Sequence, residues 1–374
     1  MLSPRARRGT VFLLIAAALA VIIGIVPLPY GIEAPGPSWN TLGTSTVTDK
    51  DGKKTEVPLI TVTGGESYPT TGNLNLLTVN LFGNPSSKPT LFEVLASLFN
   101  PERTVLPLDV FFPPGQSQEE ADKENKAQMV DSQQEAIAAA FTKLGYDVTD
   151  LKVDKVLDGS PAQGRLEVGD IIVSVNGTPI ASIAQLREVL AVNGADKPAK
   201  FVYLRDKVSF TTEITPVLSD PDSAGNQAPI IKVLGSSTYA FPFKVTIQLN
   251  DVGGPSAGLM FALGVYDKLT PDDLTGGRKI AGTGTIDASG IVGPIGGIKE
   301  KMYGARNAGA QYMFVPAENC DEAYGHVPSG IRIFKVATMT DALTDLAVIA
   351  LPDSDSTRAA ALDGLKTCTA PASK

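Results

Sequence analysis

The chain has 374 residues and a formal net charge of −8, from 32 Lys and Arg residues against 40 Asp and Glu residues. This length exceeds what a single hydrophobic core usually holds, so we expect at least two folded domains. The basic residues form no cluster beyond the first ten positions, which excludes a nucleic-acid surface that works by counterion release. Walker A and dinucleotide-binding patterns are absent as well, so we expect no nucleotide, no other cofactor and no metal.

The N-terminus carries an apolar run. Residues 11–28 contain no charged side chain and follow Arg5, Arg7 and Arg8. A run of this length is about long enough to cross a bilayer, and arginines before it are expected to stay in the cytoplasm. We therefore predict that residues 1–30 are a cytoplasmic N-terminus and a single-pass transmembrane anchor, with the rest of the chain extracytoplasmic. A cleaved signal peptide is the alternative, although the run is long for one and no cleavage site precedes Pro27.

Residues 31–125 alternate short apolar segments with Gly, Pro and Ser. This pattern predicts strands at 59–63 and 76–81, joined by loops. The polar stretch from Gln116 to Lys126 has no apolar stripe and is expected to be a linker, followed by a helix whose apolar residues recur from Ala136 to Leu144. We interpret 31–125 as a juxtamembrane region of strands and loops that ends in a linker, and its residues indicate no function.

Residues 148–218 carry the pattern of a compact β domain. Gly-Ser-Pro-Ala at 159–162 is followed by Leu-x-x-Gly-Asp-Ile-Ile-x-x-Val-Asn-Gly at 166–177. Asn176-Gly177 predicts a tight turn that needs positive φ, and we expect a helix at 183–190 and a strand at 201–204. This run of motifs resembles a PDZ domain of the type found in bacterial proteases. Together with the helix before it, the predicted PDZ-like domain spans 126–218.

The PDZ resemblance implies that this domain binds an extended peptide as an added strand, with backbone amides that receive a terminal carboxylate. Leu144, Gly145 and Tyr146 are the candidates for the carboxylate loop, where the sequence departs most from the PDZ pattern. Polypeptide substrates or peptide C-termini would then be the partners. A small β domain that only spaces or occludes its neighbour is the alternative.

The C-terminal part of the chain holds the two cysteines, Cys320 and Cys368. Two cysteines are too few for a disulfide scaffold or a zinc cluster. Outside the cytoplasm they could pair and tie down the tail, whereas two unrelated free thiols are the other possibility. Residues 219–352 alternate predicted strands and helices and form the second predicted domain, and 353–374 are expected to be a flexible tail.

Ser256 lies at the start of a predicted helix, after a predicted strand at 245–249 and a glycine-rich turn at 250–255. Free backbone N–H groups and the helix dipole favour negative charge at such a position, which suits a nucleophilic hydroxyl and an oxyanion. An ordinary N-cap serine would give the same local pattern. The residues alone therefore leave both interpretations open.

The segment Gly-Pro-Ser-Ala-Gly at 254–258 also fits the nucleophile elbow of α/β-hydrolases. That interpretation needs a later Asp or Glu and a histidine, and His326 is the only histidine in the chain. His326 lies in a turn-like stretch, and no second histidine exists to build an oxyanion motif. A Ser-His-Asp triad thus remains a weak alternative.

A lysine is the other base that the sequence offers. Gly-Pro-Ile-Gly-Gly-Ile-Lys at 293–299 places Lys299 at the expected start of a helix. Burial and the positive end of a helix lower the pKa of an ammonium group, which a lysine needs in order to act as a base near pH 7. Ile298 is expected to help desolvate Lys299. Lys301, two residues later, is expected to face solvent. Ordinary first-turn lysines are the alternative.

Taken together, Ser256 in Gly-Gly-Pro-Ser-Ala-Gly, Lys299 in Pro-Ile-Gly-Gly-Ile-Lys-Glu-Lys and Thr283 in Ala-Gly-Thr-Gly-Thr-Ile closely resemble the proteolytic domain of the Lon peptidase family. The resemblance covers residues 244–319. It implies a serine-type endopeptidase with a Ser256–Lys299 dyad, an acyl-enzyme intermediate and a hydroxyl of Thr283 that orients the lysine. Backbone groups at Gly254, Pro255 and Ser256 are our candidates for the oxyanion hole.

The fold class that follows is α+β: a transmembrane helix, a PDZ-like β domain and a Lon-type proteolytic α/β domain. An ATPase module is absent from this sequence, and the arrangement resembles the YlbL-type membrane-anchored PDZ-Lon peptidases. The resemblance implies ATP-independent hydrolysis of unfolded or exposed segments, and a ring-like homo-oligomer. The competing hypothesis is a membrane-anchored scaffold that binds peptides and has lost catalysis.

Overall fold

The computed structural model describes residues 14–15, 23–48, 52–221, 226–249 and 252–370. Most of the apolar run at 11–28 lies outside these residues. Among the residues that are described, no helix has both the length and the apolar character needed to cross a membrane.

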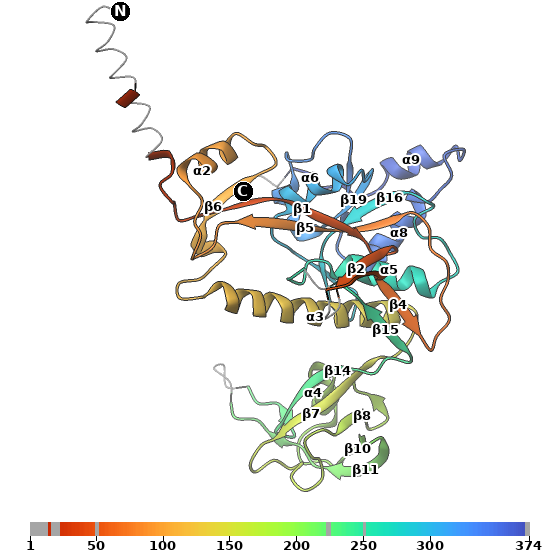
Figure 1. Ribbon diagram of the computed structural model, residues 1–374. Coiled ribbons are helices and arrows are strands. Elements are labelled where there is room, and N and C mark those ends of the chain that lie inside the picture. The colour runs from red at the N-terminus through yellow and green to blue at the C-terminus, as the bar shows by residue number, and fades with distance from the viewer. Residues whose placement is uncertain (1–13, 16–22, 49–51, 222–225, 250–251, 371–374) are drawn as a thin grey trace, which may run out of the picture. The chain divides into compact units, whose positions relative to one another are not determined.

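The chain forms two compact units, and the second is inserted into the first. The larger unit combines Met1–Leu144 with Phe243–Lys374, and the inserted unit is Gly145–Pro242 (Figure 1). The expected sequential division at 125, 218 and 352 is therefore wrong. Residues 31–125 are not a separate juxtamembrane region, because their strands belong to the same sheet as the C-terminal strands.

A six-stranded mixed sheet with the order β20-β19-β16-β5-β1-β6 forms the centre of the larger unit. Its strands are β1 (Tyr30–Asn40), β5 (Asn73–Phe82), β6 (Thr104–Pro107), β16 (Lys279–Gly282), β19 (Tyr312–Pro316) and β20 (Arg332–Val336). The strands from β20 to β5 pair in parallel, and β1 pairs antiparallel with both β5 and β6. The predicted strand at 76–81 is confirmed as part of β5.

β5 joins the two halves of this sheet, and its two edges are paired over different lengths. On one side β1 pairs with β5 from Asn75 to Phe82. On the other side β16 pairs only with residues Asn73 to Leu76. Within the described residues no strand pairs with this second edge from Leu77 onward.

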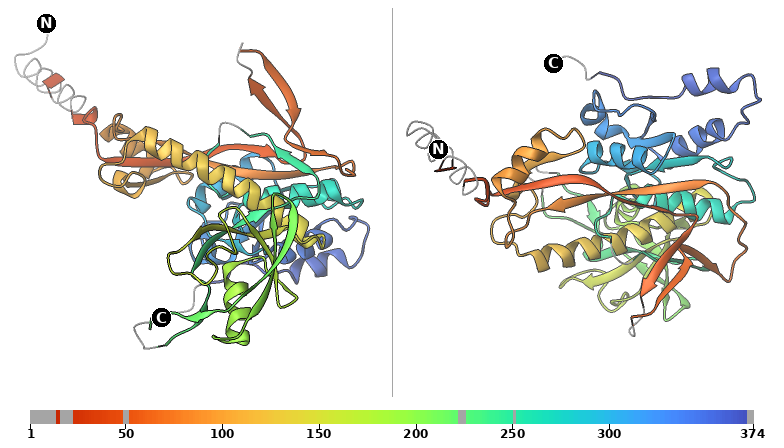
Figure 2. Two further views of the ribbon diagram at one scale, coloured as in Figure 1. Left: turned by 90° about the horizontal axis from the view of Figure 1, so that it is seen from below. Right: turned by 45° about the horizontal axis from the view of Figure 1, so that its top comes forward.

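Short sheets and hairpins complete the strands of the larger unit. They are β2 (Thr44–Thr48) with β3 (Lys54–Pro58), β4 (Ile60–Thr63) with β15 (Lys244–Ile247), and β17 (Thr285–Ile286) with β18 (Val292–Gly293). The β2–β3 hairpin projects from the unit in both views of Figure 2. The predicted strands at 59–63 and 245–249 correspond to β4 and β15.

Helices cover both faces of the central sheet. Figure 1 draws α6 on one face, and α5 and α3 on the other. The helices are α2 (Leu91–Leu98), α3 (Gln118–Lys143), α5 (Gly258–Leu269), α6 (Ile298–Asn307), α7 (Cys320–Ala323), α8 (Met339–Ile349) and α9 (Arg358–Asp363), with 3-10 turns at Leu108–Val110 and Ala317–Asn319. Ile298 and Met302 of α6 pack with Leu77 of β5 and Met313 of β19 in one buried cluster.

The stretch expected to be a linker is the start of the longest helix. α3 begins at Gln118, where Ser117 and Glu120 form a capping box with each other's backbone N–H groups. The Glu, Lys and Gln residues that follow are good helix formers even without an apolar stripe. The linker prediction for 116–126 failed because we relied on hydrophobic periodicity and did not consider the capping signal.

The C-terminal tail is also part of the fold. Cys320 and Cys368 form a disulfide, and Cys368 packs against the apolar cluster beneath α6. Arg358 of α9 donates to the Tyr312 hydroxyl of β19 at 2.8 Å. Residues 353–370 are thus held against the sheet, contrary to the flexible tail that we expected.

The inserted unit has its own core and a sheet with the order β11-β10-β8-β7-β14, with β9 paired to β8. Its elements are β7 (Thr149–Val156), β8 (Ile171–Val175), β9 (Thr178–Pro179), α4 (Ile183–Asn193), β10 (Ala199–Arg205), β11 (Val208–Ile214), β12 (Val217–Leu218), β13 (Pro229–Ile230) and β14 (Val233–Tyr239). Asn176 and Gly177 have φ values of 52° and 82°, which confirms the predicted hairpin turn. The helix predicted at 183–190 is α4.

Candidate active site

Ser256 lies at the end of a short loop, residues 252–256, that we call the serine loop. The loop connects β15 to α5, which begins two residues after the serine, at Gly258. α3 holds this loop in place: the backbone N–H of Gly254 donates to the Asn125 carbonyl at 2.9 Å, and Ser132 Oγ donates to the Pro255 carbonyl at 2.9 Å. The position of the serine therefore depends on a helix that the sequence gave us no reason to associate with it.

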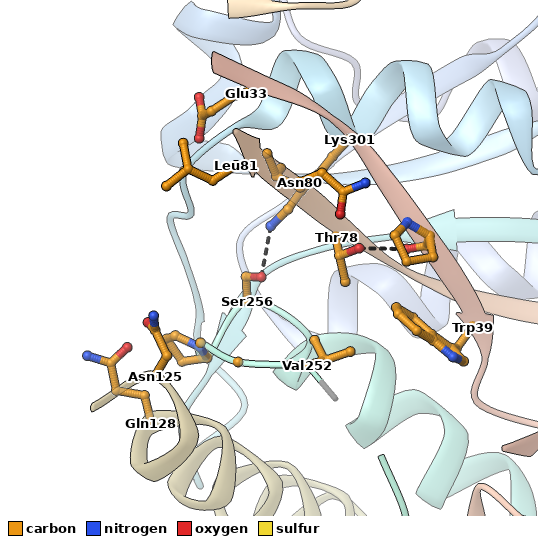
Figure 3. Close-up of a pocket in the computed structure, with 16 residues that line it drawn as sticks. Glu33, Trp39, Thr78, Asn80, Leu81, Asn125, Gln128, Val252, Ser256 and Lys301 are labelled. Carbon is orange, nitrogen blue, oxygen red and sulfur yellow. Dashed lines mark hydrogen bonds between the residues drawn. The ribbon is translucent and has the colours of Figure 1, made fainter. Parts of the chain in front are cut away.

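Lys301 of α6 is the residue that contacts the serine. Its Nζ lies 2.8 Å from Ser256 Oγ (Figure 3). The same Nζ lies 3.1 Å from Thr283 Oγ1. Thr283 follows β16 directly and is fully buried, and its hydroxyl donates to the Ser256 carbonyl at 3.0 Å. The three side chains thus form one hydrogen-bonded group, built from the start of α5, the end of β16 and the first turns of α6.

The pairing of Ser256 with Lys299 is wrong. Lys299 Nζ donates to the Arg103 carbonyl at 3.1 Å and lies 3.5 Å from Thr104 Oγ1. Lys299 is a partly exposed neighbour of β6, whereas Lys301 is only 3% exposed. The sequence separation between serine and lysine is therefore 45.

Helical periodicity favours Lys301 over Lys299. Ile298, Met302 and Ala305 form the buried stripe of α6, and residues at spacings of three and four share a helix face. Lys301 is three residues after Ile298 and falls within this stripe. Lys299 is turned by about 100° from Ile298 and lies at the edge of the stripe.

Burial sets the protonation of Lys301. Desolvation lowers the pKa of its ammonium group to about 7, although the charges of Glu33 and Glu322 act in the opposite direction. The N-terminal turns of α6 add a dipole that also disfavours positive charge. A substantial fraction of Lys301 is therefore neutral near pH 7, and a neutral amine has the lone pair that a base needs.

Glu33 of β1 is a carboxyl group that lines the same site as Ser256 and Lys301. Desolvation, followed by the charges of Glu300 and Glu322, raises the pKa of Glu33 to about 7. A Cβ atom on Gly297 would lie 3.5 Å from Glu33 Oε1 and 3.7 Å from Glu300 Oε2. Both carboxyl groups therefore approach the backbone at the start of α6, where Gly297 has a left-handed φ of 67°.

The serine loop offers fewer oxyanion donors than we predicted. The N–H of Gly254 is already bonded to Asn125, and Pro255 has no N–H to donate. Of the three predicted positions, only the N–H of Ser256 remains suitable. A substrate would therefore need this group together with a donor outside 254–256, or a rearrangement that releases Gly254.

A cavity of about 440 Å³ opens beside the serine. Glu33 and Trp39 of β1 and residues 78–81 of β5 line one side, and Gln128 of α3 with the serine loop lines the other (Figure 3). The residues of β5 that line the cavity come after Leu76, where β16 no longer pairs with the strand. The cavity thus combines an open strand edge with a hydroxyl nucleophile.

The other predicted functional residues lie elsewhere. His326 is exposed and lines a second cavity with Glu300 and Glu322. The side chain bonded to Ser256 Oγ is Lys301, so the Ser-His-Asp alternative has no support. Leu144 caps the C-terminal end of α3. Gly145 and Tyr146 begin the inserted unit, and the structure leaves their predicted role in carboxylate binding untested. Among the described residues, no group of His, Cys, Asp and Glu is arranged to hold a metal.

Comparison with known proteins agrees with this arrangement. Residues 250–352 match the Lon protease (S16) C-terminal proteolytic domain, and residues 128–204 match the PDZ domain. Residues 250–352 are thus similar to a Lon-type serine peptidase domain, in agreement with the serine–lysine geometry. The PDZ match begins within α3 and covers about the first 60 residues of the inserted unit.

The curated relatives are Lon proteases that the chain matches over a small part of their length. The Lon protease of Lachnoclostridium phytofermentans is 36% identical over 93 residues, which cover 24% of this chain and 11% of that protein. Lon protease 2 of Bacillus subtilis is 31% identical over 133 residues, covering 34% and 22%. Among solved structures, the PDZ domain of an SdrC-like protein from Listeria monocytogenes has a TM-score of 0.20 and 22% identity, covering 23% of this chain and 85% of that one.

Proposed function

We propose that the protein is a membrane-anchored, ATP-independent serine endopeptidase in which Ser256 is the nucleophile and Lys301 is the general base. One observation carries this proposal: the Nζ of a buried lysine lies 2.8 Å from the serine hydroxyl in an open cavity. An amine that is partly neutral near pH 7 can accept the hydroxyl proton at that distance.

The first step transfers the Ser256 proton to the lone pair of Lys301 as Oγ attacks the carbonyl carbon of the substrate. The resulting oxyanion would accept the Ser256 N–H and a second donor. Collapse of the tetrahedral intermediate breaks the C–N bond, and Lys301 returns its proton to the leaving amine. Lys301 then deprotonates a water molecule, which hydrolyses the acyl-enzyme and regenerates Ser256.

Thr283 positions the base in this scheme. Its hydroxyl donates to the Ser256 carbonyl, so its oxygen is free to accept an N–H of Lys301. The single lone pair of the neutral amine can then point at Ser256 Oγ. We assign Thr283 as a positioning residue.

The unpaired edge of β5 supports a mode of substrate binding. Thr78 to Leu81 line the cavity, and the backbone edge beyond Leu76 has no strand partner in the described residues. An extended peptide can add to such an edge through backbone hydrogen bonds, with little dependence on its sequence. We propose that substrates bind as a strand beside β5, with the scissile carbonyl at Ser256. Only unfolded or exposed segments can adopt this form.

The PDZ domain supplies a second peptide-binding surface in this proposal. β14 is an edge strand of its sheet, and α4 packs near it. Strand addition at a sheet edge is the general way in which such domains hold peptide ends. We propose that substrate tails or regulatory peptides bind there, and that several copies of the chain associate, as the family resemblance implies.

The membrane anchor and the extracytoplasmic location of both domains remain part of the proposal. They depend on the uncharged run at 11–28 and the arginines before it. The disulfide between Cys320 and Cys368 agrees with this location, because such bonds persist in oxidising compartments. ATP independence rests on the absence of a Walker A pattern from this sequence.

The test is cleavage of an unfolded protein by the detergent-solubilised chain without nucleotide, with Ser256→Ala, Lys301→Ala and Lys299→Ala compared. We expect the first two variants to lose roughly 10³-fold or more in kcat/KM and Lys299→Ala to stay within a few-fold of wild type. A fluorophosphonate probe should label wild type at Ser256. Full activity of Lys301→Ala would refute the dyad, and an unreactive wild type would favour the scaffold hypothesis.

A further inference from the structure

α2 presents its large apolar side chains to the outside. Phe92, Leu95, Leu98 and the following Phe99 are 54%, 44%, 63% and 88% exposed. Their spacing places them along one side of the helix. The side of α2 that faces the protein buries Val94 and Ser97 instead. This distribution is the reverse of that on a helix at a water-facing surface.

The same helix is bonded to the segment that leaves the predicted anchor. The N–H of Leu91 donates to the Val26 carbonyl at 3.0 Å, and the N–H of Leu28 donates to the Pro89 carbonyl at 2.8 Å. The Phe92 ring packs so closely on Gly24 that a Cβ atom there would collide with it. Figures 1 and 2 both show α2 beside this segment.

The exposed apolar surface continues from the helix onto this segment. Ile23, Ile25 and Val26 are 55%, 60% and 45% exposed. We call these three residues, together with Phe92, Leu95, Leu98 and Phe99, the apolar patch. Its first three residues lie at the end of the uncharged run at 11–28.

The occupant that fits the apolar patch is a lipid bilayer. We propose that α2 lies in the outer interface of the membrane that residues 11–28 cross, with its apolar side roughly 5–10 Å into the boundary between headgroups and acyl chains. The hydrogen bonds to Val26 and Leu28 hold α2 next to the end of the anchor, which fixes its depth. Lys88 is exposed two residues before the N-cap of the helix and can meet anionic headgroups. This inference depends on the proposed anchor.

Single tryptophans in the full-length chain test this directly. In a Trp39→Phe background, which removes the only native tryptophan, Phe99→Trp reports on the apolar patch. Ala359→Trp on the exposed side of α9 is the matched control. The proteins are placed in vesicles of phosphatidylcholine and phosphatidylglycerol, with or without bromine on the acyl chains.

We expect the Phe99→Trp emission to be blue-shifted and strongly quenched by brominated lipid, while the Ala359→Trp emission is not quenched. Solvent-like emission that bromine leaves unchanged would overturn the inference. A blue shift without quenching, lost on dilution of the protein in the vesicles, would replace the bilayer with a second copy of the chain. Alkaline extraction tests the membrane anchor separately from the role of α2. A chain that is extracted would refute both. A chain that stays in the membrane but shows no quenching would refute only the role of α2.

Discussion

The Nζ atom of Lys301 lies 2.8 Å from the Oγ atom of Ser256, and helix α6, which carries the lysine, and helix α5, which follows the serine, lie on opposite faces of the central sheet. The meeting point of the two side chains is just beyond Gly282, where β16 ends and its pairing with β5 stops. The end of this strand therefore creates both the space for the lysine and the open edge on which a substrate can lie.

Replacement of Lys301 by an apolar residue is expected to abolish activity and to raise the free energy of unfolding. A lysine whose pKa falls from 10.5 to about 7 on folding binds more protons in the unfolded state, so its burial opposes folding fully below pH 7 and not at all above pH 10.5. Lys301→Met should therefore abolish cleavage while raising the free energy of unfolding by a few kcal/mol, on the order of values for other buried charges replaced by apolar groups. Urea titrations at pH 6 and pH 10 measure this. The gain in the free energy of unfolding should be larger at pH 6 than at pH 10. An equal gain at both pH values would contradict a pKa of about 7 for Lys301 in the folded protein.

The pH profile of cleavage should follow the neutral form of Lys301. We expect kcat/KM to rise between pH 6 and pH 8, because the pKa of the lysine is about 7. Glu33 titrates in the same range, so the apparent midpoint belongs to the pair. Glu33→Gln removes a negative charge that raises the lysine pKa, and should move the midpoint to lower pH. Glu56→Gln, an exposed site on β3, should leave it in place.

Thr283 should act through its hydroxyl alone. Thr283→Val keeps the shape of the side chain but leaves a Lys301 N–H without its acceptor, so we expect kcat to fall roughly 10- to 100-fold with little change in KM. Thr283→Ser keeps the hydroxyl and should recover most of the activity. If Thr283→Val kept its activity and Thr283→Ser lost it, packing of the methyl group and not the hydroxyl would be the cause.

Binding beside β5 predicts a specific dependence on the peptide backbone. Successive residues of a strand direct their N–H groups to opposite sides. N-methylation of a peptide substrate at one position after another should therefore lower kcat/KM at alternate positions, by roughly 5- to 50-fold for each hydrogen bond lost. Side-chain substitutions at the same positions are the control. A smooth dependence on position, without alternation, would exclude strand addition.

The disulfide should stabilise the larger unit without taking part in catalysis. It joins α7 to the tail across 48 residues, and such a link is worth about 2–4 kcal/mol. The double variant Cys320→Ser and Cys368→Ser should lose stability in that range, expose the tail to trypsin and retain the wild-type KM. An unchanged melting temperature would show that the packing of α9 is sufficient.

Local patterns predicted much of the fold but not how distant segments combine. The β-hairpin at Asn176-Gly177, helix α4 and strands β4, β5 and β15 follow from periodicity and turn residues within a few positions. The insertion of the PDZ domain could not be predicted in this way, because β5 pairs with β16, a strand that follows roughly 200 residues later. The mistaken choice of Lys299 was different, since the buried stripe of α6 was already present in the sequence.

The order of elements along the chain also determines when the enzyme can first act. β1 and β5 are synthesised before the inserted domain, whereas Ser256, Thr283 and Lys301 are synthesised after it. A growing chain folds from its N-terminus onward, so the first half of the sheet must wait for its parallel strands until nearly the whole chain has been made. A nascent chain therefore lacks the serine loop that forms one side of the cavity, and it lacks the hydrogen-bonded group of Ser256, Thr283 and Lys301, until most of the chain has been made.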